Sequence, residues 1–339
     1  MVAATNLSDE TALAYHGGGL AAARRLFPQA PEPWLDLSTG INAAPFPFAP
    51  VSAAAYARLP EAESIAELEG AAAERFGLGA GAGIVAAPGT QALIQLLPRL
   101  LGAKKVAILG FTYAEHQRVW AASGAEVAVC DRLDELAHAD LAVVVNPNNP
   151  DGRLCNPRDL RDLARGMSAE GKSLIVDEAF IDLLPRENSL APLLPLPGVL
   201  VLRSFGKTFG LAGLRLGFAL GETSLTDSLR AAIGPWAVSG AAVEIGIEGY
   251  RDRAWLNETA ARLGRDCARL DALLAAAGFE IVGGTPLFRL ARHEHAQQIF
   301  RRLCGAGVLT RPFATRPGWL RFGLPHGEAD FARLAQAFV

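Results

Sequence analysis

The stretch that decides the fold is SFGKTFGLAGLRLG, residues 204–217, which follows an apolar run at residues 199–202. It places Lys207 among small and apolar residues, in a chain with four lysines and twenty-eight arginines. A lysine in this setting is a poor solubilising charge. Desolvation or a neighbouring cation lowers the pKa of a lysine enough for the free amine to attack a carbonyl and form a Schiff base. We therefore predict that Lys207 is catalytic, and that Arg215 is the neighbouring cation or holds a cofactor phosphate.

The triplet GKT at residues 206–208 also suggests a phosphate-binding P-loop. That motif requires a glycine five positions before the Gly-Lys pair. Val201 stands at that position, so the spacing excludes a nucleotide site of this kind.

The same stretch resembles the cofactor-lysine segment of the fold-type I pyridoxal-phosphate enzymes, the aminotransferase superfamily. Those enzymes carry S-x-x-K followed by G-x-x-x-G-x-R-x-G; Ser204, Lys207, Gly213, Arg215 and Gly217 match this pattern, and Phe209 stands at its first glycine. The resemblance implies that Lys207 binds pyridoxal phosphate and that Ser204 and Arg215 contact it. A surface lysine is the alternative, because a single motif is a hypothesis until its context agrees.

Two upstream segments supply that context. NPNNPDG at residues 146–152 directly follows an apolar strand, and SLIVDEAF at residues 173–180 contains a buried strand that ends at Asp177. The resemblance implies that Asn149 hydrogen-bonds the phenolic oxygen of the cofactor, and that Asp177 keeps its pyridine nitrogen protonated as an electron sink. A carboxylate at the carboxyl end of a parallel strand also lies where such sheets bind ligands. Taken singly, the two segments are compatible with an ordinary Asn-Pro turn and with a cap or ion-pair residue.

Two further segments complete the expected cofactor site. Gly89, Thr90 and Gln91 follow a predicted strand at residues 84–87 and precede a helical pattern. Their backbone N–H groups would therefore lie at a helix N-terminus, a ready site for the cofactor phosphate, with Thr90 as a candidate N-cap. Tyr113 occupies the position whose ring stacks on the cofactor in related enzymes, although simple packing is the alternative.

The chain departs from the family at two positions. Phe180 stands where many members carry a tyrosine that donates to the phenolic oxygen of the cofactor, three residues after the aspartate. Leu59 replaces a tyrosine that in many relatives reaches across the dimer to the cofactor phosphate of the partner. The spacing of Tyr56 from Pro60 does not suit it as a substitute.

Global features exclude several classes of function. The 339 residues carry a formal net charge of −3 with mixed signs, so there is no basic stripe for nucleic acid and no polybasic face for a membrane surface. No apolar run approaches the length of a membrane-spanning helix, and no secretory signal is found. The four cysteines lack the spacing of a zinc site or a disulfide framework. We expect a cytoplasmic enzyme without a metal.

The periodicity predicts an α/β fold of fold-type I architecture with two domains. Residues 1–50 form a proline-rich arm that we expect to pack with the small domain, residues 51–235 form the large cofactor-binding domain, and residues 236–339 form the small α+β domain. A long helix is expected at residues 254–277. In the large domain, strand and helix patterns alternate, which is typical of a mainly parallel sheet. Its seven strands are expected at residues 84–87, 105–109, 126–130, 141–145, 173–177, 199–203 and 215–220.

Residues outside the cofactor site point to the substrate. Arg321 matches the arginine that binds the substrate α-carboxylate in this superfamily. A guanidinium suits a carboxylate because it can donate two parallel hydrogen bonds to the two carboxylate oxygens. His-Gly-Gly at residues 16–18 and Ser-Thr-Gly-Ile-Asn at residues 38–42 resemble segments of the threonine-phosphate decarboxylases of cobalamin biosynthesis. By that resemblance, the residues around the phosphorylated substrate would be His16, Gly17, Asn42, Asn149 and Arg311.

The favoured hypothesis is therefore decarboxylation of L-threonine O-3-phosphate to (R)-1-amino-2-propanol phosphate by a pyridoxal-phosphate enzyme. An aminotransferase of the histidinol-phosphate type, acting on a phosphorylated amino compound, is the alternative. A non-enzymatic pyridoxal-phosphate sensor is the weakest candidate. The superfamily also implies a homodimer.

Overall fold

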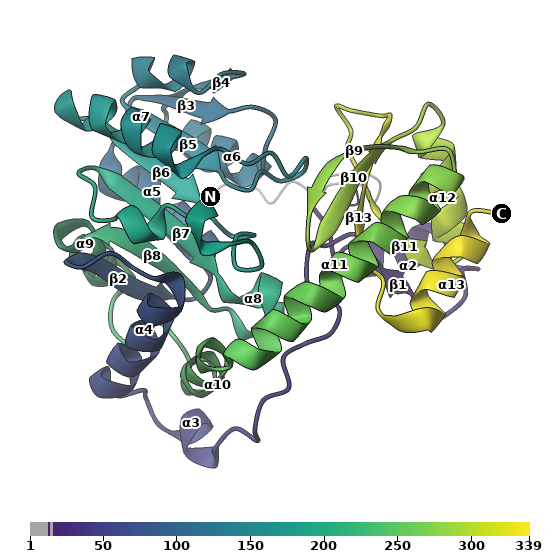
Figure 1. The fold of residues 1–339 in the computed structure, drawn as a ribbon, viewed down its shortest axis with the longest axis horizontal. Helices are drawn as coiled ribbons and strands as arrows, with labels where there is room; N and C mark the ends of the chain where they lie inside the picture. Colours follow the sequence, from purple (N-terminus) through teal and green to yellow (C-terminus); the bar gives the residue numbers. More distant parts are fainter. Residues whose placement is uncertain (1–12, 14–15) are drawn as a thin grey trace. The chain divides into compact units, whose positions relative to one another are not determined.

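The computed structural model describes Leu13 and residues 16–339, and these divide into two compact units (Figure 1). The larger unit contains residues 45–149 and 153–258. The described part of residues 1–44 belongs to the smaller unit, together with residues 150–152 and 259–339. The segment at residues 1–12 and 14–15, within the expected N-terminal arm, lies outside the described residues.

The larger unit is built on a seven-stranded sheet in the order β2-β8-β7-β6-β5-β3-β4. Five neighbouring strands are parallel, and β8 is antiparallel to both β7 and β2. The central strands read as continuous apolar runs because both faces of this sheet are covered. The strands are β2 (Ala82–Ala87), β3 (Lys105–Leu109), β4 (Glu126–Cys130), β5 (Leu141–Val145), β6 (Ser173–Asp177), β7 (Val199–Ser204) and β8 (Gly217–Glu222).

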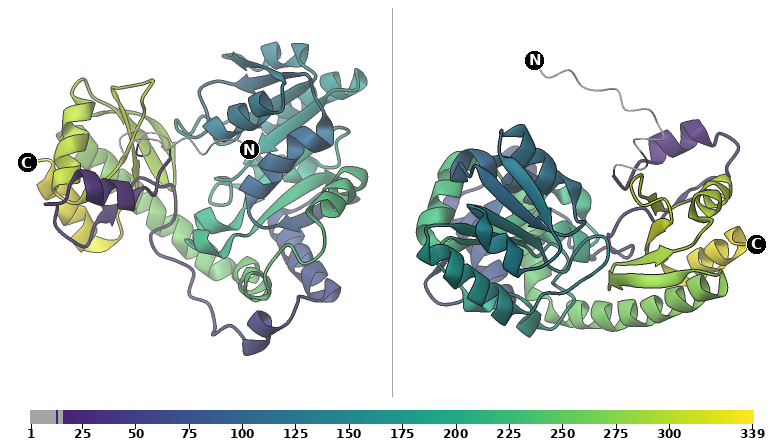
Figure 2. Two further views of the ribbon diagram at one scale, coloured as in Figure 1. Left: turned by 180° about the vertical axis from the view of Figure 1, so that it is seen from behind. Right: turned by 90° about the horizontal axis from the view of Figure 1, so that it is seen from above.

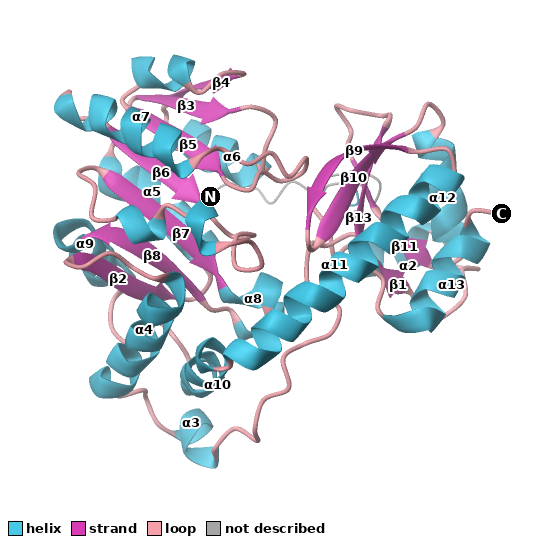
Figure 3. Cartoon of the chain, in the orientation of Figure 1, coloured by secondary structure: helices cyan, strands magenta, loops and turns pink. Residues whose placement is uncertain are grey.

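Two sets of helices cover the two faces of this sheet (Figure 3). One core lies between the sheet and α5, α6 and α9, and the other lies between the sheet and α4, α7 and α10. The helices of this unit are α3 (Ala53–Ala57), α4 (Ala62–Phe76), α5 (Thr90–Leu101), α6 (Ala114–Ala122), α7 (Pro157–Ala169), α8 (Phe205–Thr208), α9 (Thr223–Ile233) and α10 (Gly240–Arg251).

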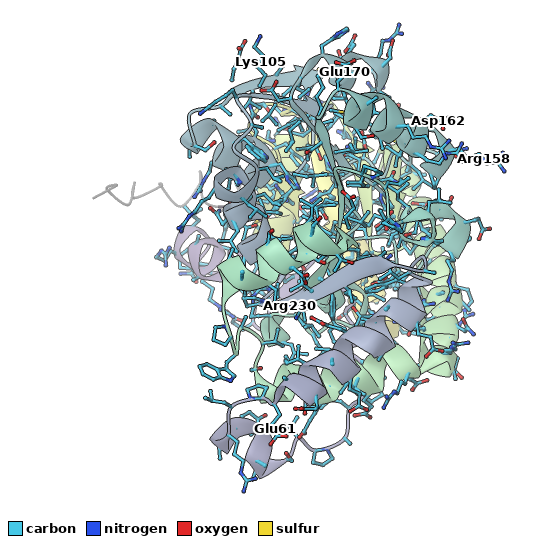
Figure 4. The ribbon with its side chains drawn as sticks, turned by 90° about the vertical axis from the view of Figure 1, so that its left-hand side faces the viewer. Glu61, Lys105, Arg158, Asp162, Glu170 and Arg230 are labelled. Carbon is cyan, nitrogen blue, oxygen red and sulfur yellow. The ribbon has the colours of Figure 1, made fainter. Side chains whose placement is uncertain are left out.

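Charged side chains lie on the outside of the larger unit. Lys105, Arg158, Asp162 and Glu170 point outward from its surface (Figure 4). Arg158 and Asp162 are on α7, whose apolar positions Leu160, Ala164 and Met167 are buried in the core. This division between one apolar stripe and one charged face is what anchors an amphipathic helix on a sheet.

The smaller unit contains a four-stranded antiparallel sheet in the order β12-β13-β10-β9 and a two-stranded parallel pair of β1 with β11. Because β1 comes from the N-terminal segment, residues far apart in the chain are joined here (Figure 2). The elements are α2 (Leu20–Leu26), β1 (Leu35–Asp36), β9 (Glu280–Thr285), β10 (Phe288–Arg292), α12 (Ala296–Gly305), β11 (Val308–Leu309), β12 (Arg311–Pro312), β13 (Trp319–Gly323) and α13 (Gly327–Ala337).

The architecture confirms the predicted fold class. All seven predicted strands of the large sheet are present, and each begins and ends within two residues of its predicted bounds. The long helix, α11, runs over Arg253–Ala276. The boundary between the units differs from the one expected after residue 235. Residues 236–258 cluster with the larger unit, in which α10 packs on α4. The boundary therefore falls inside α11.

The four cysteines are free thiols. Cys267 and Cys304 are buried, and burial raises the pKa of the Cys304 thiol to about 12. Among the described residues, no helix combines the length and apolarity needed to cross a membrane, and no group of three or more potential ligands could hold a metal ion.

Candidate active site

The predicted cofactor residues follow the carboxyl ends of neighbouring parallel strands. Asn149 follows β5, Asp177 ends β6, and Lys207 lies on α8 just after β7. Because β5, β6 and β7 are adjacent and parallel, their carboxyl ends meet at the same edge of the sheet. The sheet topology therefore brings these three residues to one edge of the larger unit.

Asp177 is buried, and its carboxylate is paired with a histidine that the sequence analysis did not single out. His116 Nε2 lies 2.9 Å from Asp177 Oδ2, and the backbone N–H of Ala179 donates to Asp177 Oδ1 at 3.1 Å. We assign a proton to His116 Nε2 because a carboxylate only accepts hydrogen bonds. The pairing orients the carboxylate from behind and leaves its charge available to a cationic ring nitrogen.

The turn between β2 and α5 provides a site for an anion. Gly89 is the N-cap of α5 with φ of +83°, so the cap is this glycine and not Thr90, which the sequence analysis had considered. A side chain at Gly89 would lie 2.6 Å from a terminal nitrogen of the Arg215 guanidinium. A side chain at Gly217 would lie 2.7 Å from the backbone nitrogen of Thr90. Two glycines thus let Arg215 and the N-terminus of the helix approach each other, and both attract an anion.

Tyr113 and Gln91 are joined in a chain of hydrogen bonds. The Tyr113 hydroxyl donates to Gln91 Oε1 at 3.1 Å, and Gln91 Nε2 donates to Glu115 Oε2 at 2.8 Å. The rings of Tyr113 and His116 meet edge to face at 6.2 Å. Tyr113 is the N-cap residue of α6, so this helix positions both the tyrosine and the histidine that pairs with Asp177.

Lys207 lies on a single helical turn that is held by aromatic packing. Its Nζ is 5.7 Å from the ring centroid of Phe180, the residue that stands where relatives carry a tyrosine. The rings of Phe205 and Phe209, on either side of the lysine, stack at 4.0 Å. A side chain at Gly206 would lie 2.7 Å from the backbone of Ala212, which keeps the turn close to the loop that follows it.

Asparagines after β5 order the loop that carries Asn149. Asn146 Oδ1 accepts from the backbone of Cys155 at 2.7 Å, and Asn148 Nδ2 donates to the Phe111 carbonyl at 3.0 Å. Asn149 itself is buried. The neighbours of Asn149 therefore hold its loop in place, while its own assigned role rests on the family resemblance.

These residues fit pyridoxal phosphate. The Gly89 turn and Arg215 suit the phosphate, Asp177 suits a protonated pyridine nitrogen, Asn149 suits the phenolic oxygen, and Lys207 suits the aldehyde carbon. The donor and acceptor types match the group at each of these points. The observation that carries the fit is the close approach of the Arg215 guanidinium to Gly89, at a helix N-terminus where a larger side chain would collide with it.

The predicted carboxylate and phosphate residues belong to the smaller unit. Arg311 on β12 and Arg321 on β13 are directly opposite each other across the antiparallel ladder, and both side chains are buried. Arg321 Nη2 donates to the Ser38 carbonyl at 2.8 Å, and Arg311 lies over the ring of Phe313. Like charges directly opposite in a ladder repel each other, and an anionic ligand relieves that repulsion.

The N-terminal residues are packed against the same unit. A side chain at Gly17 would lie 2.3 Å from the Ser38 carbonyl oxygen, so only glycine fits there. Asn42 is buried, and its Oδ1 accepts from Arg262 Nη2 at 2.9 Å. His16 lies beside Gly17 in the chain and is partly exposed. The structure thus groups the HisGlyGly and SerThrGlyIleAsn segments with the arginine strands in one unit.

Sequence reasoning missed His116, Arg262 and the contact of Ser38 with Arg321. The histidine could have been found, because it lies three residues after Tyr113 and therefore on the same side of one helix. The bonds of Arg321 to Ser38 and of Arg262 to Asn42 join residues far apart in the chain, and no local signal predicts them.

Comparison with known proteins identifies the family. The Aminotransferase class I and II family model matches residues 50–338. A threonine-phosphate decarboxylase from Sinorhizobium sp is 43% identical over 96% of this chain and 97% of the relative. One from Pseudomonas aeruginosa is 40% identical with the same coverage. A histidinol-phosphate aminotransferase from Sinorhizobium meliloti, solved with pyridoxal-5'-phosphate, superposes with a TM-score of 0.79 at 20% identity, over 94% of this chain and 92% of that one. The chain belongs to the aminotransferase class I and II family.

Proposed function

We propose that this protein is a pyridoxal-phosphate-dependent decarboxylase of L-threonine O-3-phosphate that forms (R)-1-amino-2-propanol phosphate. The observation that carries the proposal is the pair of buried arginines, Arg311 and Arg321, on facing strands. Two neighbouring guanidinium groups suit a small substrate with two anionic groups, a phosphate and a carboxylate. The similarity to two threonine-phosphate decarboxylases over nearly the whole chain supports the same substrate.

Each residue has a defined task in this proposal. Arg321 holds the α-carboxylate, and Arg311 holds the phosphate with His16, the Gly17 amide and Asn42. When bound at Lys207, pyridoxal phosphate supplies the electron sink that makes cleavage at the substrate Cα possible. The charge of Asp177 favours that sink, and His116 fixes the direction of the Asp177 carboxylate. After carbon dioxide has left, the ammonium group of Lys207 delivers one proton to Cα and becomes the neutral amine.

One assay tests the reaction. Purified protein is given L-threonine O-3-phosphate with and without 2-oxoglutarate, and both carbon dioxide and glutamate are measured. The proposal requires carbon dioxide in both mixtures. Glutamate formation that depends on 2-oxoglutarate, without carbon dioxide, would establish the aminotransferase alternative. More distant relatives carry the name histidinol-phosphate aminotransferase.

The two arginines should differ in what they recognise. Arg311→Gln is expected to weaken binding of threonine phosphate by on the order of 10–100-fold, because a charge-assisted hydrogen bond to the phosphate is lost. Binding of unphosphorylated threonine should change little. Arg321→Gln provides the internal control, since it should weaken both compounds alike through the shared carboxylate. Titration with the two compounds measures the difference, and equal losses in Arg311→Gln would place Arg311 outside the phosphate site.

We also propose a homodimer that works in the cytoplasm. The larger unit exposes the apolar side chains of Tyr56, Leu59 and Trp236. Trp236 lines a cavity of about 420 Å³ together with Pro60, which directly follows Leu59 in the chain. Exposed apolar groups gathered in this way are typical of protein interfaces. The four free thiols suit a reducing compartment.

Light scattering should give twice the chain mass of 35.7 kDa. Leu59→Glu is expected to shift the protein toward the monomer, because it places a charge in the buried part of the interface. Val129→Glu is the matched control, since Val129 is also half-exposed but lies on the edge strand β4. A wild-type monomer with full activity at nanomolar concentration would contradict the dimer.

A further inference from the structure

A second set of charged side chains lies on the face of the large sheet opposite to that of Asp177. Alternate residues of a strand face opposite sides of a sheet. Strands β6 and β7 direct three side chains to the face covered by α5, α6 and α9, namely Ile175, Leu200 and Leu202. To the face covered by α4, α7 and α10 they direct Leu174, Val176, Val199 and Val201. Continuing this alternation, Asp177 falls on the first side, in agreement with its bond to His116, and Glu178 and Arg203 fall on the second.

Glu178 and Arg203 are buried in one network with Asp182 and Ser189. Glu178 Oε2 accepts from Ser189 Oγ at 2.6 Å and from Arg203 Nη1 at 3.2 Å, and Glu178 Oε1 accepts from the Leu190 N–H at 2.6 Å. Arg203 also donates to Asp182 and to Ser189 Oγ. All four residues are less than a tenth exposed. Buried charges persist only when they are paired in this way.

The network is ionic. Burial raises the pKa of Glu178, but three donors occupy its two oxygens and leave no acceptor for a carboxyl proton, so we assign it the charged form. Burial alone would lower the pKa of the Arg203 guanidinium. The Asp182 and Glu178 carboxylates outweigh burial and hold that pKa above its ordinary value. One guanidinium therefore joins two carboxylates, and its rigid fork sets the distance between them.

The network lies where the backbone ladder between β6 and β7 stops. The last backbone bond between the two strand ends is donated by Glu178 to the Leu202 carbonyl at 2.9 Å. Beyond this point the segment after β6 continues into the turn at residues 178–182, and the segment after β7 continues into the helix that carries Lys207. Side-chain bonds from Arg203 replace backbone bonds at the place where these two segments separate.

We propose that Glu178, Arg203 and Asp182 are positioning residues, which keep the Asp177 carboxylate and the Lys207 helix at a constant distance from each other and act from the face of the sheet opposite to that of Asp177. The proposal rests on the proposed function for its consequence, but the geometry it describes belongs to the chain alone. None of the three residues contacts the reacting groups. Their effect passes through the single peptide that joins Glu178 to Asp177 and through the short segment between Arg203 and Lys207.

The test separates positioning from simple stability. Arg203→Lys keeps the charge but lacks the fork that reaches Glu178 and Asp182 together. Leu160→Ala is the matched control, because Leu160 is fully buried in the core on the same side of the sheet and has no part in the network. The two variants are compared at temperatures set equally far below their own melting points.

Two measurements are made on each variant. Hydrogen exchange of the cofactor-free protein is followed at Ala179, whose N–H is bonded to Asp177 Oδ1, and at Phe205, whose N–H is bonded to the Leu216 carbonyl. The dissociation constant of pyridoxal phosphate is then measured by absorption. In Arg203→Lys we expect exchange at both amides to be at least about tenfold faster, and the cofactor to be bound at least about tenfold more weakly, than in Leu160→Ala.

The outcomes are distinct. Equal exchange rates and equal cofactor affinities in the two variants would overturn the proposal and leave the network a purely stabilising one. If the wild-type protein binds no pyridoxal phosphate, the proposed function fails, and the exchange measurement alone decides on positioning. If Arg203→Lys does not fold, Glu178→Gln takes its place. This variant keeps the Arg203–Asp182 bond. It replaces the carboxylate that accepts from Ser189 and Arg203 by a neutral amide, which is a weaker acceptor on one side and a donor on the other.

Discussion

Replacement of Lys207 by alanine is expected to abolish decarboxylation, with a loss of turnover on the order of 10⁴-fold or more. The amine is the only group on α8 that can form a Schiff base with an aldehyde carbon, so its removal leaves the cofactor held by its phosphate and ring contacts alone. Dialysis should then remove the visible absorption that the wild-type protein retains. Borohydride reduction followed by peptide mapping should attach the cofactor to Lys207 in the wild-type protein.

Lys105→Ala is the control for this prediction. Lys105 begins β3, is exposed, and points outward from the larger unit (Figure 4). Its variant should keep the wild-type spectrum and rate. Reduction that labels Lys104, Lys105 or Lys172 in place of Lys207 would refute the assignment of the catalytic lysine.

Replacement of Asp177 by asparagine should lower turnover by at least about a hundredfold, because a neutral amide cannot stabilise a positive charge on a ring nitrogen. The fold should survive, since the amide has the same shape: its oxygen can still accept from the Ala179 N–H, and its NH2 group can donate to His116 Nε2 once the imidazole proton moves to Nδ1. Cofactor binding should also persist through the Gly89 turn, Arg215 and Lys207. Steady-state kinetics together with the absorption spectrum of the loaded protein measures both effects.

Asp162→Asn is the matched control for the same chemical change. Asp162 lies on the exposed face of α7 and pairs with the neighbouring Arg161. An exposed pair of this kind contributes little to stability, so this variant should behave as the wild type does. If Asp177→Asn retained a near-native rate, the ring nitrogen would have to be stabilised by another group.

The strand ends that carry the candidate cofactor residues could be predicted because their signals are local. Lys207, Asp177 and Asn149 each follow an apolar run of strand length, and the carboxyl ends of adjacent parallel strands meet at one edge. The contact between His116 and Asp177 joins residues 61 positions apart and was not predicted. Neither was the division of the units inside α11, because α10 carries no composition signal that tells which neighbour it packs on.

The sequence by itself determined the number and type of the elements in the large sheet and the order in which the candidate cofactor residues follow its strands. Periodicity of apolar residues encodes these features, and it acts over a few residues. Only the tertiary structure decided which polar groups meet: Asp177 with His116, Arg321 with the Ser38 carbonyl, and Glu178 with Arg203. The physical reason is that a buried polar group takes its partner from whatever the packing of distant segments places beside it, and no local pattern records that choice.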